Sequence, residues 1–222
     1  MSTLRVIKSG MLTTVQDAGR WGYQAHGVPV SGPMDPLSHR LANALVGNDR
    51  DAATLEVTLL GPELEFEDER MVAVTGARFV VTVDGKPTPS AGPFVVSAGA
   101  RLRFETRERG VRAYLAVSGG IAVAPVLGSR STHVISALGG LRGRPLRPGD
   151  PLPLGDPGRL RRVVAPPAEP IVDLPERRAR LRVLPGPQLE NFAPGTLDVL
   201  QQAPYAIGQN SDRMGFRCTA RR

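Results

Sequence analysis

A single stretch near the start of the chain, residues 13–35, gathers side chains suited to acid–base and anion-binding chemistry. Its polar groups are those of Gln16, Asp17, Arg20, Ser31 and Asp35. An Asp and an Arg three residues apart can present a carboxylate and a guanidinium fork to one small polar ligand. The alternative is a structural surface loop with an internal ion pair.

The backbone of this stretch is rich in turn formers. Four glycines and two prolines shape it: Gly19, Gly22, Gly27, Gly32, Pro29 and Pro33. Glycine permits positive φ and proline fixes φ, so several consecutive turns are expected. Such a loop can hold polar side chains in a fixed arrangement.

A second candidate segment is LGSRST, residues 127–132, which places Ser129, Ser131 and Thr132 around Arg130. Three hydroxyls and a guanidinium suit an oxyanion such as a carboxylate, a carbamate or a phosphate. The segment lacks the Gly-Lys-Ser/Thr end of a P-loop, so ATP binding cannot be read from this chain alone. A serine-rich turn capped by its own side chains is the alternative reading.

A third segment repeats the pairing of an acidic and a basic residue. Ser211, Asp212 and Arg213 are adjacent, and we expect them to face one cavity together with residues 13–35 and residues 127–132. No metal set is expected, because the three histidines are scattered and Cys218 is the one cysteine. We expect His39 to lie on the polar side of a helix, facing solvent.

These segments must be positioned mainly by strands. Short runs rich in Val, Leu, Phe and Thr predict strands at 54–60, 71–76, 79–85, 94–99, 101–107 and 111–120. Asp84-Gly85 predicts a tight turn. One helix is predicted from Pro36 to Gly47, with Leu37, Leu41 and Leu45 recurring along it and Asp35 at its cap. Asp35 therefore has two readings, as a helix cap and as a catalytic carboxylate.

Composition bounds the class of protein. The 222 residues, 41% of them hydrophobic, can build a real core. Neither a signal peptide nor a long apolar run is present, and we expect a cytoplasmic protein without a membrane partner. The net charge of +7 comes almost wholly from arginine. Since aromatic residues are few, at 5%, we expect no nucleic-acid partner.

The organisation along the chain predicts three parts. Residues 1–155 form an N-terminal β domain, residues 156–180 a Pro/Arg-rich connector, and residues 181–222 a second β lobe that opens at LRVLPGPQLE. We expect this second lobe to be incomplete, because the chain stops soon after SDRMGFR.

The ordered blocks of this chain resemble the biotin-dependent carboxyltransferase-like family, which includes allophanate hydrolase subunit 2, a domain of urea carboxylase, and the C subunit of bacterial 5-oxoprolinase. The resemblance is carried by TTVQDAGRWG, GVPVSGPMD, LANALVGN, LEVTLLGP, RAYLAVSGGI, LGSRST, LGGLRGRPLRPGD and SDRMGFR. It implies a mainly β fold: a cyclophilin-like β-barrel with one short helix after the N-terminal motif, plus the start of a second β lobe.

The resemblance also implies an activity. We expect one component of an ATP-dependent 5-oxoprolinase, opening 5-oxo-L-proline to L-glutamate with separate A and B subunits. The expected catalytic residues are Asp17, Arg20 and Asp35. The expected substrate- and anion-binding residues are Gln16, Ser31, Ser129, Arg130, Ser131, Thr132, Ser211, Asp212 and Arg213.

Two other readings stay open. The first is carboxyl transfer from carboxybiotin to urea or a related amide, for which biotin and its carboxylase would have to come from elsewhere, because no Met-Lys-Met sequence is present. The second is a non-catalytic regulatory protein that resembles the antagonist of a sensor-kinase inhibitor.

Overall fold

The computed structural model describes residues 2–89, 91–157, 182–209, 211 and 215–220. The chain divides into two compact units, Met1–Arg177 and Arg178–Arg222. The predicted connector at 156–180 lies almost entirely outside the described residues. Each unit is described by itself.

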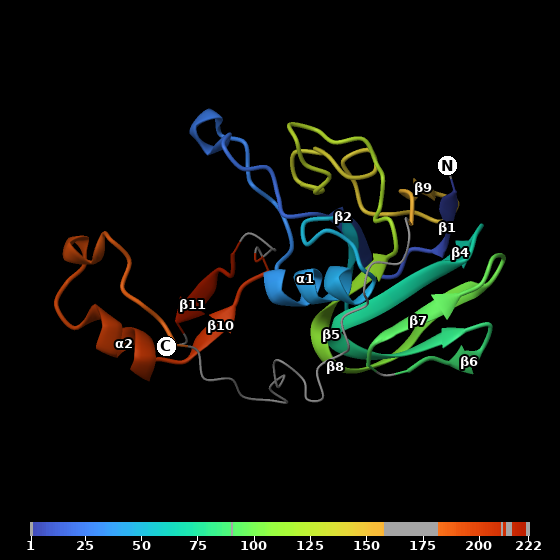
Figure 1. Ribbon diagram of the computed structural model, residues 1–222. Coiled ribbons are helices and arrows are strands. Elements are labelled where there is room, and N and C mark those ends of the chain that lie inside the picture. The colour runs from blue at the N-terminus through green and yellow to red at the C-terminus, as the bar shows by residue number, and fades with distance from the viewer. Residues whose placement is uncertain (1, 90, 158–181, 210, 212–214, 221–222) are drawn as a thin grey trace. The chain divides into compact units, whose positions relative to one another are not determined.

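The first unit is a curled, mainly antiparallel sheet with one α-helix packed on it (Figure 1). The sheet order is β2-β3-β8-β4-β1-β9, and β5 also pairs with β6, β7 and β8. The elements are β1 Thr3–Lys8, β2 Leu12–Gln16, η1 Gln24–His26, α1 Pro36–Leu45, β3 Thr54–Thr58, β4 Glu63–Phe66, β5 Arg70–Val83, β6 Lys86–Pro87, β7 Pro93–Val96, β8 Arg101–Val117 and β9 Pro151–Pro153. The predicted mainly β fold with a short helix after the motif is confirmed.

The two long strands β5 and β8 pair with each other along the sheet, in place of the four shorter strands that the sequence predicts. The predicted strands at 71–76 and 79–85 are one strand, β5, and those at 101–107 and 111–120 are one strand, β8. Their pairing shifts register near Gly76, whose φ is +85°. Glycine accommodates such bulges without ending the strand, so the sequence break marks a bend.

Two local predictions are confirmed. Asp84 and Gly85, both at positive φ, make the turn between β5 and β6, where Val83 pairs with Lys86. At α1, the Asp35 carboxylate accepts from the backbone N–H groups of Leu37 and Ser38, with Pro36 at the first helical position.

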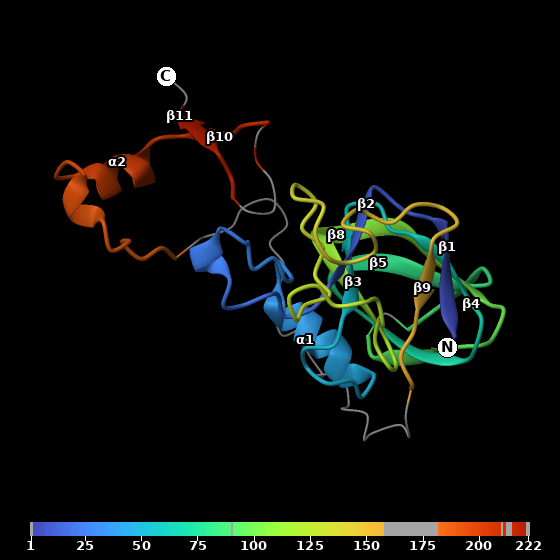
Figure 2. The same cartoon turned by 90° about the horizontal axis from the view of Figure 1, so that it is seen from above.

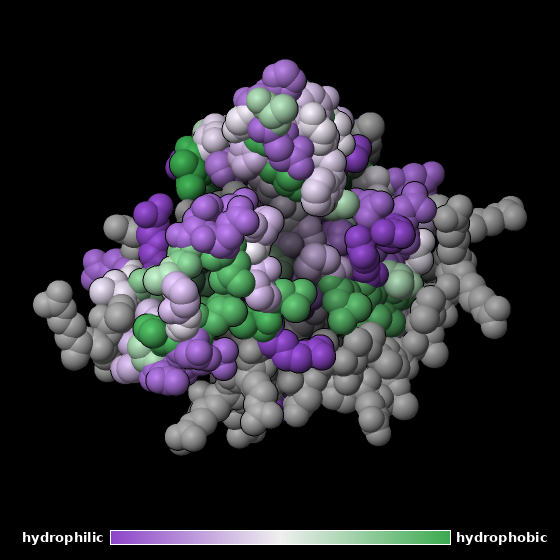
Figure 3. Space-filling model, turned by 90° about the vertical axis from the view of Figure 1, so that its left-hand side faces the viewer, coloured by the Kyte–Doolittle hydropathy of each residue, from purple (hydrophilic) through white to green (hydrophobic). Residues whose placement is uncertain are grey.

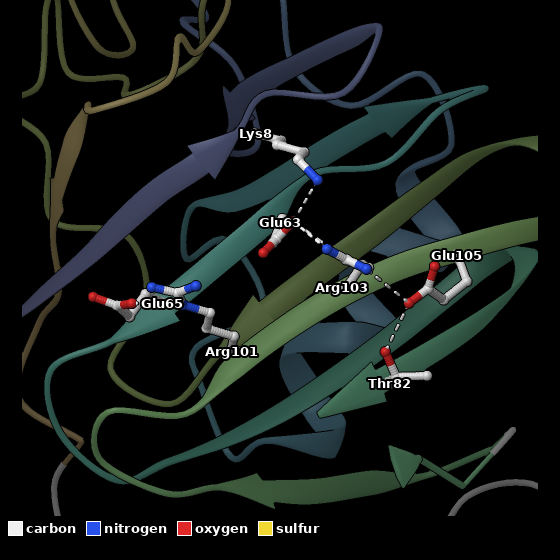
Figure 4. Close-up of polar contacts among 7 residues, drawn as sticks. All are labelled: Lys8, Glu63, Glu65, Thr82, Arg101, Arg103 and Glu105. Carbon is white, nitrogen blue, oxygen red and sulfur yellow. Dashed lines mark hydrogen bonds and ion pairs between the residues drawn. The ribbon is translucent and has the colours of Figure 1, made fainter. Parts of the chain in front are cut away.

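The two faces of the sheet differ in character. The inner face holds the main core, to which Leu4, Leu64, Phe66, Leu102 and Leu115 contribute fully buried side chains. The outer face carries a charged ladder across β1, β4, β8 and β5 (Figure 4), made by Lys8, Glu63, Arg103, Glu105 and Thr82. Alternation of apolar and charged residues along each strand produces this division.

The second unit has η2 Leu189–Asn191, α2 Thr196–Gln202, and a two-stranded antiparallel sheet of β10 Tyr205–Ile207 and β11 Cys218–Ala220. The predicted β segment at 181–190 forms no strand over residues 182–190, where Pro185, Gly186 and Pro187 interrupt the backbone. None of its described residues is buried, and apolar side chains such as Leu184, Ile207 and Phe216 are exposed. Figure 3 shows one face of the molecule, on which hydrophobic residues, in green, lie exposed among polar ones.

Candidate active site around Asp17

The opening motif and the Leu127–Thr132 loop are brought together at the end of β2. β2 pairs with β3 on one side, with Gln16 opposite Thr54. On its other side the backbone N–H of Thr132 donates to the carbonyl O of Val15 at 2.9 Å. The structure therefore joins two segments that are more than a hundred residues apart in the chain.

Asp17 is the centre of this junction. Its Oδ1 accepts from Ser129 Oγ at 2.6 Å, from Ser131 Oγ at 2.7 Å and from the Gly19 N–H at 3.0 Å. Its Oδ2 accepts from the Arg130 N–H at 2.5 Å. Burial alone would raise the pKa of Asp17, but these hydrogen bonds outweigh it and hold the pKa below its ordinary value. Asp17 is thus ionised, and it holds the Leu127–Thr132 loop through three hydrogen bonds, an arrangement that we call the clamp.

Arg20 is buried beside this clamp, with 1% of its surface exposed. Its Nη2 donates to the Ser131 carbonyl O at 2.5 Å, and its Nη1 donates to Ser31 Oγ at 3.3 Å. Burial lowers the pKa of Arg20, while the charge of Asp17 opposes that shift. Ser131 thus lies between Asp17 and Arg20. Its hydroxyl contacts the carboxylate, and its carbonyl O contacts the guanidinium.

Gln16 and Thr132 complete the junction. Gln16 Nε2 donates to the Thr132 carbonyl O at 3.1 Å and to Thr14 Oγ1 at 3.0 Å. Thr132 Oγ1 donates to the Val15 carbonyl O at 3.0 Å. Gln16 Oε1 is buried without a hydrogen-bond partner among the described residues. As an amide oxygen, it is a hydrogen-bond acceptor.

We expected three hydroxyl groups of this loop to bind an oxyanion, but they donate within the protein. Ser129 Oγ and Ser131 Oγ donate to the Asp17 carboxylate, and Thr132 Oγ1 donates to the Val15 carbonyl O. The guanidinium of Arg130 is different. Its Nε donates to the Val123 carbonyl O at 2.9 Å, and this is the side chain's one hydrogen bond to the described residues. Its terminal nitrogens make no hydrogen bond to the described residues, and Arg130 is partly exposed.

Asp35 lies at the other end of the motif, as the cap of α1. One carboxylate oxygen accepts from the Leu37 and Ser38 N–H groups at 3.1 and 3.0 Å, and the other from Ser38 Oγ. Both oxygens are therefore used at the helix start, and the cap reading of Asp35 holds. Its catalytic role stays a prediction.

Sequence reasoning missed the pair of residues that supports this end of the motif. Glu56, on β3, accepts from Tyr114 Oη at 2.8 Å and from the Met34 N–H at 2.9 Å. Tyr114 Oη accepts from the Asp35 N–H at 2.8 Å. The signal was present in TLEVT, where a charged residue interrupts an apolar strand whose pairing buries it.

The prediction for His39 is wrong. Its side chain is buried, with 1% exposed, because α1 turns it toward the sheet, where it packs edge-on against Tyr114. Its Nε2 lies 3.1 Å from the Ala52 carbonyl O. It is Leu37 that is exposed, at 46%.

The third predicted segment is described only in part. Ser211 Oγ accepts from the Arg217 N–H at 2.9 Å. Asp212 and Arg213 lie outside the described residues, so their sharing of one site with residues 13–35 stays a prediction.

The glycines of the loops bring backbone close to backbone and side chains. A Cβ at Gly139 would lie 2.2 Å from the Ser131 carbonyl O and 2.4 Å from Arg20 Nη2. The N–H groups of Gly140 and Gly143 donate to the carbonyl groups of Arg130 and Gly139. Close packing thus explains Gly139, and the N–H groups of Gly140 and Gly143 are used in hydrogen bonds within the loops.

Several strained backbone conformations lie in the opening motif and in the loops after β8. Of the non-glycine residues described with positive φ, Ser31, Leu127, Ala137 and Arg142 lie in the motif or in the loops after β8. Such conformations cost about 1–3 kcal/mol each and persist where the surroundings enforce them.

A separate cavity of about 520 Å³ lies between α1, β5 and β7, and none of the predicted site residues lines it.

The buried His39 side chain makes the stability of the folded protein depend on pH. Burial lowers its pKa, although the carbonyl groups of Ala52 and Gln16 and the charges of Asp17 and Asp51 favour the charged form. Below the ordinary value of 6.5 the unfolded chain binds a proton that the folded chain resists. We expect wild-type stability to fall as pH drops below about 6.5. Urea unfolding from pH 8 to 5 should show less of this loss in His39→Gln. Parallel pH profiles would contradict the assignment.

Comparisons with known proteins bear on the family and the fold of this chain. The profile of the family described as carboxyltransferase domain, subdomain A and B, matches residues 26–222. The chain is 39% identical over 214 residues to the C subunit of 5-oxoprolinase from Escherichia coli strain K12, covering 96% of this chain and 67% of that protein. It is 37% identical over 224 residues to urea amidolyase of Saccharomyces cerevisiae, covering 97% of this chain and 12% of that protein.

A solved structure gives the same result for the fold. The crystal structure of Kluyveromyces lactis urea carboxylase superposes with a TM-score of 0.80 at 35% identity, covering 98% of this chain and 20% of that one. The chain thus spans about two thirds of the bacterial protein and a small part of the fungal proteins. No helix among the described residues is long and apolar enough to cross a membrane.

Proposed function

The chain belongs to the family described as carboxyltransferase domain, subdomain A and B, and from this we propose that it acts as the C subunit of a 5-oxoprolinase. The observation that carries the proposal is the 39% identity to the Escherichia coli protein over 96% of this chain. The reaction opens the lactam of 5-oxo-L-proline by adding one water across its C–N bond, which yields L-glutamate.

The site supports particular roles for this chain. Arg130 binds the substrate carboxylate through its terminal nitrogens, since a planar guanidinium pairs well with a carboxylate. Asp17 and Arg20 position the loop that carries Arg130. An Asp that already accepts four hydrogen bonds at a lowered pKa is a weak base. We therefore assign activation of the water to a partner protein of the complex.

ATP does not fit the described residues of this site. The hydroxyls of the Leu127–Thr132 loop are used on Asp17 and Val15, and its N–H groups at Arg130 and Thr132 are also bonded. We assign ATP binding to the A-like or the B-like subunit of the complex. A role for biotin belongs only to the alternative function, carboxyl transfer.

The alternative is carboxyl transfer to an amide nitrogen, favoured by the 37% identity to urea amidolyase of Saccharomyces cerevisiae. Arg130 would then bind the carboxylate that is being transferred. A regulatory role without catalysis has no specific observation in its favour.

The test combines this chain with the A-like and B-like subunits encoded in its own genome and measures glutamate formation from 5-oxoproline, with and without ATP. Arg130→Ala should raise KM at least about tenfold, because a hydrogen bond to a charged group contributes about 1.5–3 kcal/mol. Arg40→Ala, an exposed arginine of α1, is the matched control and should match wild type.

The Escherichia coli protein serves as the reference in the same assay. Turnover with that protein and none with this chain would contradict the proposed function. Carboxylation of urea by this chain with a biotin-dependent carboxylase would favour the alternative.

A further inference from the structure

The chain between β8 and β9 makes a tight turn at residues 133–138. His133 and Leu138 pair as an isolated antiparallel bridge, in which the N–H of each donates to the carbonyl O of the other, at 2.8 and 3.1 Å. Inside this bridge the Ala137 N–H donates to the Val134 carbonyl O at 3.2 Å. In Figures 1 and 2 the loops after β8, in yellow-green to yellow, lie at the end of the sheet next to β2. Backbone hydrogen bonds thus fix the shape of the turn.

Neighbouring segments hold the turn from both sides. Before it, the Thr132 N–H donates to the Val15 carbonyl O of β2 at 2.9 Å. Beyond it, the backbone of Gly143 packs so closely that a Cβ there would collide with the Ala137 carbonyl group. Ala137 itself has a φ of +49°, a conformation that persists where the surroundings enforce it. The side chains on this turn are therefore carried by a rigid backbone.

Two of these side chains, His133 and Ser136, contact each other. His133 Nδ1 accepts from the Ser136 N–H at 3.3 Å, and Ser136 Oγ lies 2.9 Å from the same nitrogen. A backbone N–H can only donate, so Nδ1 carries no proton, and the Ser136 hydroxyl must be the donor of the second bond. A neutral imidazole that accepts from a seryl hydroxyl is the arrangement in which histidine activates serine as a nucleophile.

The two partners differ in exposure. His133 is buried, with 8% of its surface exposed, whereas Ser136 is exposed. The nucleophile is thus open to a reactant from solvent, while the base is shielded. Val134 and Ile135 precede Ser136 in the chain and are 39% and 73% exposed. They provide apolar surface close to the hydroxyl in the chain.

Closing the turn does not account for the whole contact. A side chain that only closes a turn needs one bond to a nearby backbone group, and the Ser136 N–H already supplies that bond to His133. The bond from the Ser136 hydroxyl is additional. It is this second bond that gives the hydroxyl a base.

We propose that Ser136 is a site of acylation, with His133 as its base and an activated ester as the acyl donor. Ser136 Oγ forms a bond to the acyl carbon, its proton passes to His133 Nδ1, and the ester C–O bond breaks as the leaving group departs with the electron pair. The pair brings a nucleophile and a base but no donor for the tetrahedral oxyanion, so the ester must have a good leaving group. Acylation at this turn needs no other subunit and goes beyond the proposed function.

The probe is p-nitrophenyl acetate, added to the full chain alone. Release of p-nitrophenolate is followed by absorbance, and the acetylated residues are located by peptide mass spectrometry. Ser97, an exposed serine in the turn between β7 and β8, is the control within the same molecule. The variants are Ser136→Ala, Ser97→Ala and His133→Asn. Asparagine keeps an acceptor for the Ser136 N–H but cannot take the proton.

We expect a burst of p-nitrophenolate, with Ser136 acetylated at least about 100-fold faster than Ser97, as is typical of general base catalysis. Ser136→Ala should abolish the burst, His133→Asn should slow it at least about 100-fold, and Ser97→Ala should leave it unchanged. Equal acetylation of Ser136 and Ser97 in the wild type would overturn the proposal, and this comparison depends on the folding of no variant. An unchanged burst in His133→Asn, with circular dichroism like that of the wild type, would overturn the role of His133.

Discussion

Replacing Asp17 with Ala is expected to lower the free energy of unfolding by about 3–5 kcal/mol, because each buried donor that loses its acceptor costs about 1–3 kcal/mol. The change strands two seryl hydroxyls and the backbone N–H groups of Gly19 and Arg130. It also leaves the buried Arg20 without a nearby carboxylate that favours its charge. Turnover should be lost together with stability, since the loop that carries Arg130 is released.

The comparison variant is Asp35→Ala, at the opposite end of the motif. Asp35 accepts at a helix start and stays half exposed, so its loss should cost about 1 kcal/mol, as for other caps. Urea unfolding of both variants at pH 7 measures the difference directly. A stable but inactive Asp17→Ala would contradict the positioning role and assign Asp17 to the chemistry itself.

The same carboxylate gives a second readout in acid. Because hydrogen bonds hold the pKa of Asp17 below its ordinary value of 3.8, its contribution is fully present above that value and is lost as pH falls through the lower, folded-state pKa. This window lies well below that of His39. The two groups can therefore be separated in one set of unfolding curves.

The parts of the structure that follow local rules could be predicted from the sequence. Asp35 before Pro36 predicted the start of α1, and Asp84-Gly85 predicted the β5–β6 turn. Both depend on a few neighbouring residues and on no distant partner. The face that α1 buries depends on its packing against β5 and β8, and for this reason the prediction for His39 failed.

The candidate site depends on contacts between distant segments. Sequence analysis interpreted Asp17 and the Leu127–Thr132 loop as two sets of groups that face a ligand in one shared cavity. The structure shows that the sets bind each other, because Ser129 and Ser131 donate to Asp17 across more than a hundred residues. Residue types alone cannot tell a hydroxyl that holds a ligand from one that holds a neighbouring loop.

The glycines of the loop after β8 allow the sharpest test of this arrangement. Gly140 has a φ of +54°, and a Cβ there would lie 1.9 Å from Thr132 Oγ1. Gly140→Ala should cost about 1–2 kcal/mol for the left-handed backbone and about 1–3 kcal/mol more for overpacking. Gly128 is the matched control: its φ is +76° and nothing lies within 4 Å of its Cβ position, so Gly128→Ala should carry the backbone cost alone.

Thermal and urea unfolding of the two variants measure this difference, and Thr132→Ala supplies the rescue. Removing Thr132 Oγ1 takes away the nearest atom, so the double variant Gly140→Ala/Thr132→Ala should lose less stability than the sum of the two single changes. Additive losses would contradict the close contact. Partial recovery of stability in the double variant would show that Gly140 leaves room for the Thr132 side chain. Thr132 needs that room because it bonds to Val15 and so holds the loop against β2.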